Sequence, residues 1–566
     1  MKIYIKGQQS SDVDLTDSNF ITEGGEGKIY GKQGVVYKIY FDSKKVIKQA
    51  KIDDLIALDK NNILRPLDIV LDSHKVPIGF TMRWVKNVIA ICKLFTNDFR
   101  NRMGVTPEMI NELVTNLAKD IQFIHEKKCL IVDANEMNFL VDSNYITPYF
   151  IDVDSYQTEH FPATAISPAI QDYHTKGFSE YTDWFSFAII AFQLFIGIHP
   201  YKGTHPKYKK FDLEKRMIDN VSVLNSKVSL PSSVRDLSYI PTNYKDWFYN
   251  MFEKGERNLP PAITGVIFVV KKARVVQGTD QFEIELIKTF SSEIIRYENE
   301  VVFLESHAYY KNYAIRSTRS TEAVFTRVSN DLIFVDIVNH KLKIKQLMKE
   351  ETECNYDATD KMIFNNSIFI LNNDKIFEIE LQEFSGKLVP YVKSNWNVLP
   401  NATTVFKGVI YQNILGVPYL MVPYYMANGK TACFMNPINE LKGYKVLEAK
   451  RDGHVVMVIA NKNNKYDRFV FIFGSEYKDY RCRKDEDVSF HVPNFVTLEN
   501  GIAVCITEED KVEIFNSLSS KDDVKIVEDP EITFDMKLYK KGANVFIVRE
   551  NQLFSFKMKG AKNEKS

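Results

Sequence analysis

Residues 130–141 read Leu-Ile-Val-Asp-Ala-Asn-Glu-Met-Asn-Phe-Leu-Val, and residues 149–157, after a short turn, read Tyr-Phe-Ile-Asp-Val-Asp-Ser-Tyr-Gln. Two apolar runs typical of β-strands lie beside three side chains that can act on a phosphate: Asp133, Asn138 and Asp152. Four residues separate Asp133 from Asn138, and Asp152 comes directly after the second apolar run. This stretch therefore predicts the centre of a phosphate-handling site.

The chain is long enough for several domains and has no excess of charge. Its 566 residues correspond to roughly two to four domains at about 150 residues each. Hydrophobic residues make up 45% and charged residues 26%, as in ordinary globular proteins. Because Lys+Arg and Asp+Glu both number 73, the formal net charge is zero, and the composition gives no clear nucleic-acid footprint.

The sequence predicts neither a cysteine metal site nor a membrane segment. The six cysteines lie far apart, without a Cys-x-x-Cys pair, and reduced thiols fit a cytosolic compartment: Cys92, Cys129, Cys354, Cys433, Cys482 and Cys505. Residues 1–7 are typical of a strand rather than of a signal peptide. The longest apolar run, residues 184–198, is shorter than the roughly 20 residues that span a bilayer. We therefore expect a buried core helix there and a cytoplasmic protein.

Residues 20–40 predict three strands around a glycine-rich turn. The turn contains Gly24, Gly25 and Gly27, and glycines let a backbone come close to a phosphate because they carry no Cβ. Lys38 lies inside the third apolar strand, where an unpaired lysine is unfavourable. A facing phosphate would explain this position, whereas an ordinary hairpin with an edge lysine is the simpler alternative. The place of the turn upstream of the phosphate-handling stretch, with room for a small lobe between, favours a nucleotide.

Two helices are predicted between the glycine turn and the central stretch. Residues 42–59 are rich in lysine and have apolar residues at helical spacing. Residues 63–85 then predict two strands that end in a hinge near Met82. Residues 106–126 predict a long amphipathic helix that begins with a threonine N-cap and a proline, and that leads directly into the central stretch.

Residues 18 to about 261 resemble the protein kinase-like superfamily, in particular an atypical bacterial and phage group. That group has a Gly-Gly-Glu-Gly loop and an Asp-x-Asp-Ser-aromatic-Gln element in place of Asp-Phe-Gly, and this chain contains both. The spacing of Asp133 and Asn138 is that of a kinase catalytic loop. Further along, Ser167 and the following proline stand where Ala-Pro-Glu would, and residues 183–190 look like the buried helix of the large lobe.

The resemblance implies a two-lobed α+β domain with ATP- and Mg²⁺-dependent phosphotransferase activity toward protein Ser or Thr. It implies that Lys38 holds the α- and β-phosphates and that Asp133 orients and deprotonates the substrate hydroxyl. Asn138 and Asp152 would hold magnesium, and Asp183 would tether the backbone of the catalytic loop. The other implied contacts to the nucleotide come from the glycine turn and the hinge: Gly24, Gly25, Gly27 and Met82.

The chain departs from the family pattern at several positions. Ile131-Val132 replaces the His-Arg before the catalytic Asp, which argues against activation through Arg–phosphate pairing. The helix of residues 42–59 has no clear Glu for the strand lysine, so an Asp substitutes or the ion pair is absent. Without the glutamate of Ala-Pro-Glu, the usual partner of Arg257 is missing or comes from elsewhere. Asp154 takes the glycine position of Asp-Phe-Gly, either as a second carboxylate near the metal or, as we favour, as a structural cap.

After residue 261 the helical patterns give way to short β-rich runs bounded by Asn, Asp and Gly. The clearest runs are residues 300–304, 332–338, 367–371, 409–411, 454–460, 501–506 and 544–548. Their irregular spacing, on the order of the 40–45 residues of a blade, predicts a β-propeller of six or seven blades, with a pair of β-sandwiches as the alternative. The predicted order is a kinase-like domain over 1–261 (small lobe 1–85, large lobe 86–261), a linker or first strands over 262–290, a propeller-like domain over 291–558 and a charged tail over 559–566.

Other functions stay open at this point. The kinase-like half could bind nucleotide, or nothing, and serve as a scaffold or switch, as the missing helix Glu and the lost His-Arg suggest. A small-molecule kinase is a further alternative, although such relatives often keep a His-x-Asp loop and this chain has Ile131 there. In each case we expect the β domain to recruit a protein substrate or partner, without a membrane.

Overall fold

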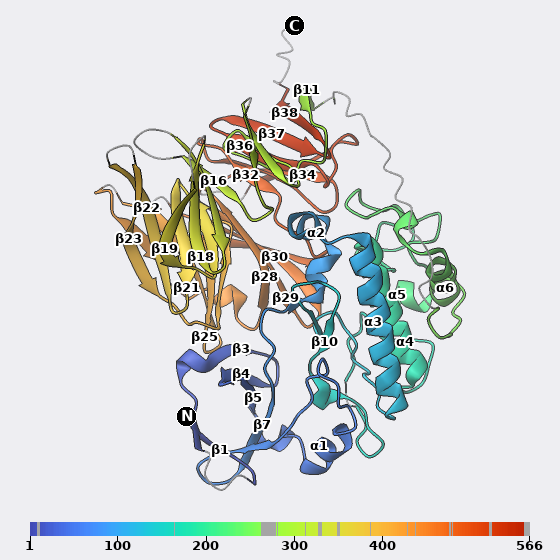
Figure 1. The fold of residues 1–566 in the computed structure, drawn as a ribbon. Helices are drawn as coiled ribbons and strands as arrows, with labels where there is room; N and C mark the ends of the chain where they lie inside the picture. Colours follow the sequence, from blue (N-terminus) through green and yellow to red (C-terminus); the bar gives the residue numbers. More distant parts are fainter. Residues whose placement is uncertain are drawn as a thin grey trace. The chain divides into compact units, whose positions relative to one another are not determined.

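A computed structural model describes residues 1–559 except 8–11, 164, 262–278, 280, 312, 326–330, 348–350, 385–386, 427, 436, 475–476, 478 and 520–522. The chain divides into two compact units (Figure 1). The first unit comprises Met1–Arg100, Gly104–Lys272 and Asn461–Tyr466, and the second comprises Asn101–Met103, Ala273–Ala460 and Asp467–Ser566. The predicted linker of residues 262–290 lies largely, and the predicted tail of 559–566 almost entirely, outside the described residues.

The first unit begins with a seven-stranded antiparallel sheet of order β2-β1-β6-β7-β5-β4-β3. Its strands are β1 (Lys2–Ile5), β2 (Asp12–Asp14), β3 (Phe20–Glu23), β4 (Gly27–Lys32), β5 (Val35–Tyr40), β6 (Ile69–Leu71) and β7 (Pro77–Arg83). The strand predicted at the start of the chain and the three strands predicted around the glycine turn are confirmed. Because β5 lies between β4 and β7, Lys38 is on an interior strand, and the edge-lysine alternative is wrong.

The helices agree with the sequence prediction in two cases and differ in one. α3 (Pro107–Glu126) is capped by the Thr106 hydroxyl, which accepts a hydrogen bond from the Met109 N–H at 3.3 Å. α4 (Glu180–Ile196) is the buried core helix. The helix predicted over 42–59 is wrong in length, because only α1 (Gln49–Leu55) forms after the short turn η2 (Ser43–Lys45). The backbone between them is extended, which buries Ile47.

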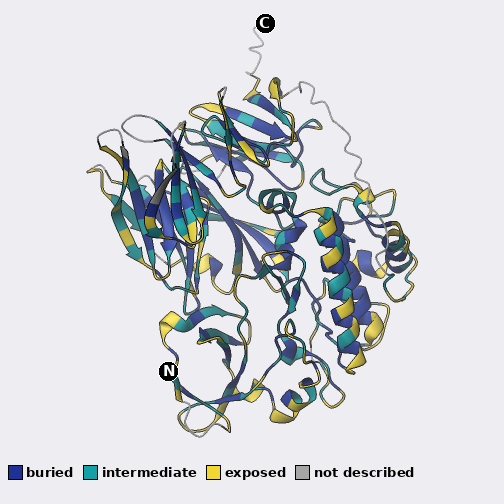
Figure 2. Cartoon of the chain, viewed as in Figure 1, coloured by how far each residue is buried: buried dark blue, intermediate teal, exposed yellow. Residues whose placement is uncertain are grey.

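The helical part of the first unit packs around α4. Aromatic side chains of α4 meet those of α6 (Thr242–Phe252), as in the pair Phe192–Phe248 with ring centroids 5.1 Å apart. Figure 2 shows α3 with exposed residues along one side, as its amphipathic sequence predicts, whereas α4 is almost entirely buried. The remaining α-helices are α2 (Asn97–Met103) and α5 (Leu213–Ile218). No described helix is long and apolar enough to cross a membrane.

Two strands of the stretch 130–157 form a three-stranded sheet of order β10-β9-β8 together with β8, which comes earlier in the chain. Its strands are β8 (Ile89–Ala90), β9 (Phe139–Val141) and β10 (Pro148–Phe150). β9 and β10 form an antiparallel hairpin in which Phe139 is opposite Phe150. The hairpin therefore places the residue before β9 and the residues after β10 at the same end.

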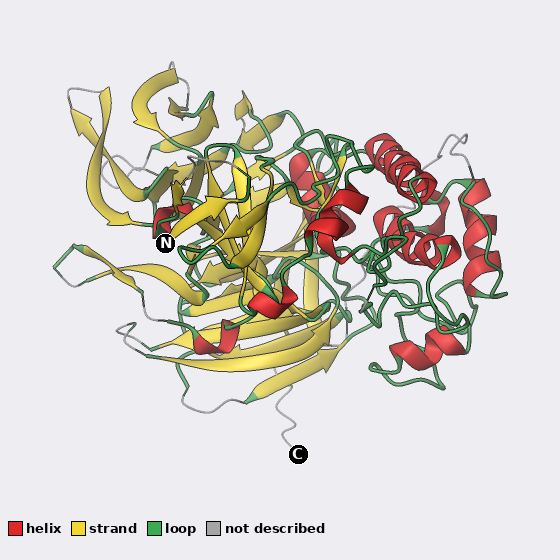
Figure 3. Cartoon of the chain, turned by 90° about the horizontal axis from the view of Figure 1, so that it is seen from below, coloured by secondary structure: helices red, strands yellow, loops and turns green. Residues whose placement is uncertain are grey.

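The second unit is built from antiparallel strands, and its described residues form seven four-stranded sheets (Figure 3). The first sheet consists of β12 (Arg296–Glu298), β13 (Val301–Phe303), β14 (His307–Tyr310) and β15 (Tyr313–Arg316). The second consists of β16 (Glu322–Phe325), β17 (Leu332–Val338), β18 (Lys341–Gln346) and β19 (Glu351–Asp357). The third consists of β20 (Asp360–Phe364), β21 (Ser367–Asn372), β22 (Lys375–Phe384) and β23 (Lys387–Asn397).

Three further sheets continue this order along the chain. The fourth sheet consists of β24 (Thr403–Phe406), β25 (Val409–Ile414), β26 (Val417–Tyr425) and β27 (Thr431–Phe434). The fifth consists of β28 (Lys445–Asp452), β29 (Val455–Lys462), β30 (Lys465–Phe473) and β31 (Tyr480–Val488). The sixth consists of β32 (Phe495–Thr497), β33 (Ile502–Ile506), β34 (Lys511–Asn516) and β35 (Val524–Glu528). The last sheet joins β36 (Lys537–Lys541), β37 (Asn544–Arg549) and β38 (Gln552–Met558) to β11 (Phe282–Thr289) from the start of the unit. All seven strand runs highlighted in the sequence form strands here.

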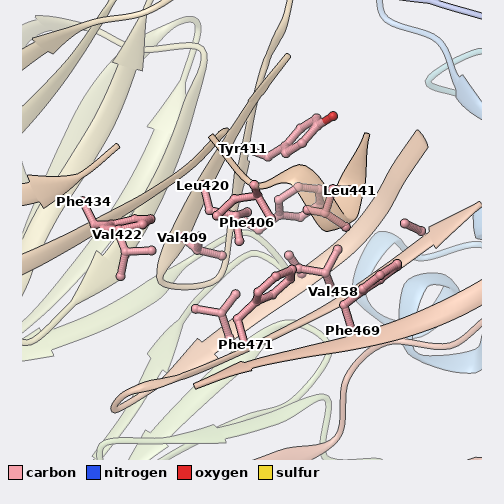
Figure 4. Packing of buried hydrophobic residues seen from close by; sticks show 14 of the residues in the cluster. Phe406, Val409, Tyr411, Leu420, Val422, Phe434, Leu441, Val458, Phe469 and Phe471 are labelled. Atoms are coloured by element: carbon pink, nitrogen blue, oxygen red, sulfur yellow. The ribbon is translucent and has the colours of Figure 1, made fainter. Parts of the chain in front are cut away.

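Neighbouring sheets of the second unit share hydrophobic cores. Figure 4 shows one such core, where Phe406 and Val409 of one sheet pack with Val458, Phe469 and Phe471 of the next. Equivalent clusters join each sheet to its successor along the chain. A further cluster joins the last sheet, through Val548, to the β12–β15 sheet, through Val302. The sequence of shared cores is therefore cyclic.

Candidate active site

Lys38 is buried in the middle of the first sheet and pairs with two carboxylates. On β5 it lies between Ile29 of β4 and Phe80 of β7. Its Nζ lies 3.0 Å from Asp152 Oδ1 and 2.6 Å from Asp154 Oδ2, and only 9% of its side chain is exposed. The structure thus explains why a lysine tolerates an apolar strand, because both partners are anions.

The β9–β10 hairpin brings Asn138 and Asp152 to one end. Asn138 comes directly before β9, and Ile151, directly after β10, donates its N–H to the Asn138 carbonyl oxygen at 3.1 Å. The next residue, Asp152, has a left-handed backbone with φ of 59° and begins the turn η4 (Val153–Ser155). This conformation is uncommon outside glycine and directs the chain away from the strand direction of β10. Asp152 remains 37% exposed at its side chain, while one oxygen binds Lys38.

Asp133 lies in a loop that is held from behind by Asp183 of α4. The wholly buried Asp183 carboxylate accepts the N–H groups of Ile131 and Val132, both at 2.8 Å, and contacts His125 of α3. Val132 has a φ of 64°, which is strained for a β-branched residue. The two hydrogen bonds to Asp183 offset that strain and hold the backbone directly before Asp133 in place.

The Asp133 carboxylate is itself hydrogen-bonded on both oxygens. Oδ2 accepts from the Asn135 side-chain amide, and Oδ1 accepts from the Ser167 N–H, each at 2.9 Å. The Asn138 amide donates to the Asp133 carbonyl oxygen at 2.8 Å. Asp133, Asn138 and the segment around Ser167 therefore form one connected loop cluster.

The charges around Lys38 do not balance. Burial raises the pKa of the Asp152 carboxyl to about 6, Asp154 adds to this shift, and Lys38 opposes it. Burial alone would lower the pKa of Lys38, but Asp154 and Asp152 outweigh it and raise the lysine pKa. Burial also raises the pKa of Tyr40, whose hydroxyl donates to Asp154 Oδ2 at 2.7 Å. Within hydrogen-bonding distance, one lysine thus faces two carboxylates, so the pair has one negative charge more than its direct partner supplies.

The glycine turn has two kinds of glycine. A Cβ at Gly27 would lie 2.3 Å from the carbonyl oxygen of Ile39, so Gly27 is needed for the close pairing of β4 with β5. Gly24 and Gly25 have no atom within 4 Å of the position a Cβ would take. The open space at these two glycines is what a covered phosphate group requires.

The residues present fit a magnesium–nucleotide ligand. Among the described residues, no donor reaches the second oxygen of Asp152 or the side-chain oxygen of Asn138. Carboxylate and amide oxygens of this kind are suitable ligands for Mg²⁺, and the surplus negative charge favours a cation. Met82 lies near the end of β7 in the seven-stranded sheet, opposite Val36, and no described contact links it to the Lys38 cluster.

Two parts of the site were left open by the sequence and are resolved by the contacts in the structure. The Asp154 carboxylate, favoured as a structural cap, binds Lys38 and Tyr40 through Oδ2, and none of the described backbone N–H groups donates to it. The missing partner of Arg257 is Asp172, which accepts from Nε at 2.6 Å and from Nη2 at 2.7 Å. The only sequence signal for that pair was an acidic residue shortly after the Ser-Pro element.

Comparison with solved structures finds 1423 matching chains, and one of them is a viral kinase. A structure of the PK-1 kinase of Cydia pomonella granulovirus matches 42% of this chain and 87% of the viral chain, with 14% sequence identity and a TM-score of 0.32. No protein-family model and no curated protein matches the chain. At this score the similarity decides neither the fold nor the function.

Proposed function

We propose that the first unit is an ATP- and Mg²⁺-dependent protein kinase that phosphorylates serine or threonine. The observation that carries the proposal is the ion pair between Lys38 and Asp152, which lie 114 residues apart in the sequence. The same hairpin end carries Asn138, and the adjoining loop carries Asp133. Phosphoryl transfer uses a strand lysine, oxygen ligands for a metal and a loop carboxylate. Lys38, the pair Asp152 and Asn138, and Asp133 are residues of these kinds.

Each residue then has a separate role. Lys38 binds the α- and β-phosphates, and the turn with Gly24 and Gly25 covers them. Asp152 and Asn138 hold magnesium, which when bound neutralises charge on the phosphates. Asp133 accepts a hydrogen bond from the substrate hydroxyl and takes its proton. Catalysis rests mainly on positioning and on charge neutralisation.

We further propose that the second unit is a seven-bladed β-propeller that recruits the protein substrate or a partner. The support is the cyclic order of shared cores, because a cluster joins the last sheet to the β12–β15 sheet. β11 completes the last sheet by pairing with β38, so strands from both ends of the unit close one blade. This pairing leaves no break between first and last blade, which two separate β-sandwiches would require.

A nucleotide-binding scaffold without catalysis is the second candidate. Both oxygens of Asp133 already accept hydrogen bonds, from Asn135 and from the Ser167 backbone. A carboxylate held in this way is less available to a substrate hydroxyl than one with a free oxygen. The first candidate is preferred because each carboxylate oxygen can accept a second hydrogen bond.

Transfer of label from γ-labelled ATP to a generic protein substrate, with magnesium, tests the proposal. Asp133→Asn and Asp152→Ala should each remove the transfer, while Glu159→Ala, at an exposed acid of the same segment, should retain it. Binding of Mg·ATP without transfer, to the chain itself or to any supplied protein, would favour the scaffold. Absence of both binding and transfer would exclude both candidates.

A further inference from the structure

The short helix α1 supplies no acidic partner to Lys38. Its two acidic residues, Asp53 and Asp54, are engaged elsewhere. Asp53 accepts from Gln49 at 3.1 Å, and Asp54 accepts from Thr158 at 2.7 Å and contacts His160 at 3.1 Å. Within the described residues, the anions on Lys38 come entirely from the segment after β10.

Of the two aspartates on Lys38, Asp154 is the closer and the more enclosed. Its Oδ2 lies 2.6 Å from Lys38 Nζ, and 7% of its side chain is exposed, against 37% for Asp152. The same oxygen accepts the Tyr40 hydroxyl, so two residues of β5 hold it. Asp152 has one oxygen free for another ligand, whereas Asp154 faces the protein.

We propose that Asp154 is the positioning residue that takes over the role of the helix glutamate of protein kinases. It keeps the Lys38 ammonium aimed at the phosphates while Asp152 turns to the metal. This inference rests on the proposed nucleotide site and adds to it a statement about regulation. In protein kinases the lysine partner is on a helix whose position controls activity. Here the partner is two residues from the proposed metal ligand, so the ion pair forms without any movement of α1.

The charge on α1 supports this assignment. Burial lowers the pKa of Lys51 on α1, and the nearby Asp154 and Asp152 act against that shift. The residue of α1 on which the two carboxylates act is thus a lysine and not an acid. With a glutamate on α1 in addition to Asp152 and Asp154, Lys38 would face three anions. The chain has the two aspartates after β10 and no glutamate on α1.

Replacement of the carboxylate tests the inference. Asp154→Asn keeps the size of the side chain and an acceptor for Tyr40 but removes the negative charge that faces Lys38. We expect the KM for ATP, and the Kd of Mg·ATP measured by calorimetry, to rise about 10-fold or more, since a charge-assisted hydrogen bond is lost. Asp154→Glu should stay within about 3-fold of the original chain, because the charge is restored. Asp53→Asn on α1, the matched control, should change neither constant.

The KM and the Kd separate positioning from a merely structural role, because partial unfolding lowers the amount of active protein and leaves both constants unchanged. An Asp154→Asn chain with the original constants would overturn the inference, and so would an Asp53→Asn chain with raised ones. If Asp154→Asn fails to fold, Tyr40→Phe takes its place, with a KM about 3-fold higher expected and an unchanged KM contradicting the inference. An original chain that binds no Mg·ATP would overturn the proposed function instead.

Discussion

Two aspartate clusters of the first unit use the same chemistry in opposite ways. Asp172 is buried and binds the Arg257 guanidinium through two hydrogen bonds, so one anion meets one cation. Burial would raise the pKa of Asp172, but Arg257 outweighs burial and the pKa is lowered. At Lys38, two aspartates share one cation, and the pKa of Asp152 is raised to about 6, mainly by burial.

This is the difference expected between an ion pair that stabilises the fold and a site that binds a ligand. The Asp172 pair is balanced and leaves no ligand position open, as a contact for stability should be. The Lys38 cluster carries an extra negative charge and an exposed carboxylate oxygen, which cost stability unless a cation binds. Charge balance and exposure thus favour the Lys38 cluster as the candidate site independently of the sequence pattern. The same isosteric replacement at both clusters should therefore have opposite consequences.

Asp152→Asn should give the largest effect. We expect the rate of phosphoryl transfer to fall about 1,000-fold, because the metal loses its anionic ligand. The free energy of unfolding should stay the same or rise, since the change removes one of two neighbouring negative charges. Transfer assays and urea unfolding of the same preparation measure the two quantities. A large loss of stability would show that the Asp152–Lys38 pair is a fastening like that of Asp172.

Asp172→Asn should have the reverse pattern. The Arg257 charge would remain buried without an anion, so we expect the free energy of unfolding to fall by about 3 kcal/mol. At a temperature where the variant is still folded, transfer should stay within a few-fold of the original. Urea unfolding followed by tryptophan fluorescence suits this test, because Trp84, Trp184 and Trp247 belong to the first unit. Inactivity of the folded variant would contradict the distinction.

The two kinds of glycine in the turn sharpen the comparison further. Gly27→Ala should lower the free energy of unfolding by about 2 kcal/mol, because the Cβ would overlap the Ile39 carbonyl oxygen. Gly25→Ala should leave stability unchanged, since nothing lies within 4 Å, but should raise the KM for ATP. Thermal unfolding and ATP kinetics on the two variants check this. An unchanged KM for Gly25→Ala would place the phosphates elsewhere.

Much of the fold is predictable from sequence because local pattern decides it. The strands around the glycine turn, α3 and the strands of the second unit follow from periodicity and from turn residues. The helix predicted over 42–59 failed because apolar spacing alone does not reveal that the backbone near Ile47 is extended to bury that side chain. The sequence left six or seven four-stranded sheets open, because the strand spacing along the chain is irregular, and the described residues of the second unit form seven.

The sequence predicts only those parts of the site whose residues lie at a characteristic spacing along the chain. The spacing of Asp133, Asn138 and Asp152 gave the loop and the hairpin. The contacts of Asp154 with Lys38, and of Asp172 with Arg257, join residues 116 and 85 positions apart. No local pattern encodes such pairs, because they depend on how the seven-stranded sheet, the β9–β10 hairpin and the helices pack. The sequence shows where an acidic residue lies along the chain, but it does not show which basic residue that acid contacts in the fold.

His199 offers a weaker test on the structural side of the comparison. Its ring is buried, donates from Nε2 to the Ala169 carbonyl oxygen at 2.8 Å, and accepts from the Tyr201 N–H at 3.2 Å. It therefore holds the same segment that Asp172 and Arg257 fasten. Burial lowers the pKa of His199 to about 3, from 6.5 as the ordinary value. The ring is neutral in the folded chain.

Acid should therefore weaken this fastening. Between pH 6.5 and 3 the unfolded chain binds a proton at His199 that the folded chain does not, so stability from this group is present above pH 6.5 and is lost as the pH falls. From pH 7 to 5.5 we expect a loss of about 1 kcal/mol in the free energy of unfolding. His199→Gln should flatten the pH dependence by that amount, whereas His74→Gln, at an exposed histidine, should leave it unchanged. If the pH dependence is the same with and without His199, the ring is not buried in its neutral form. The pH-dependent stability of the segment after Ser167 would then come from the Asp172–Arg257 pair.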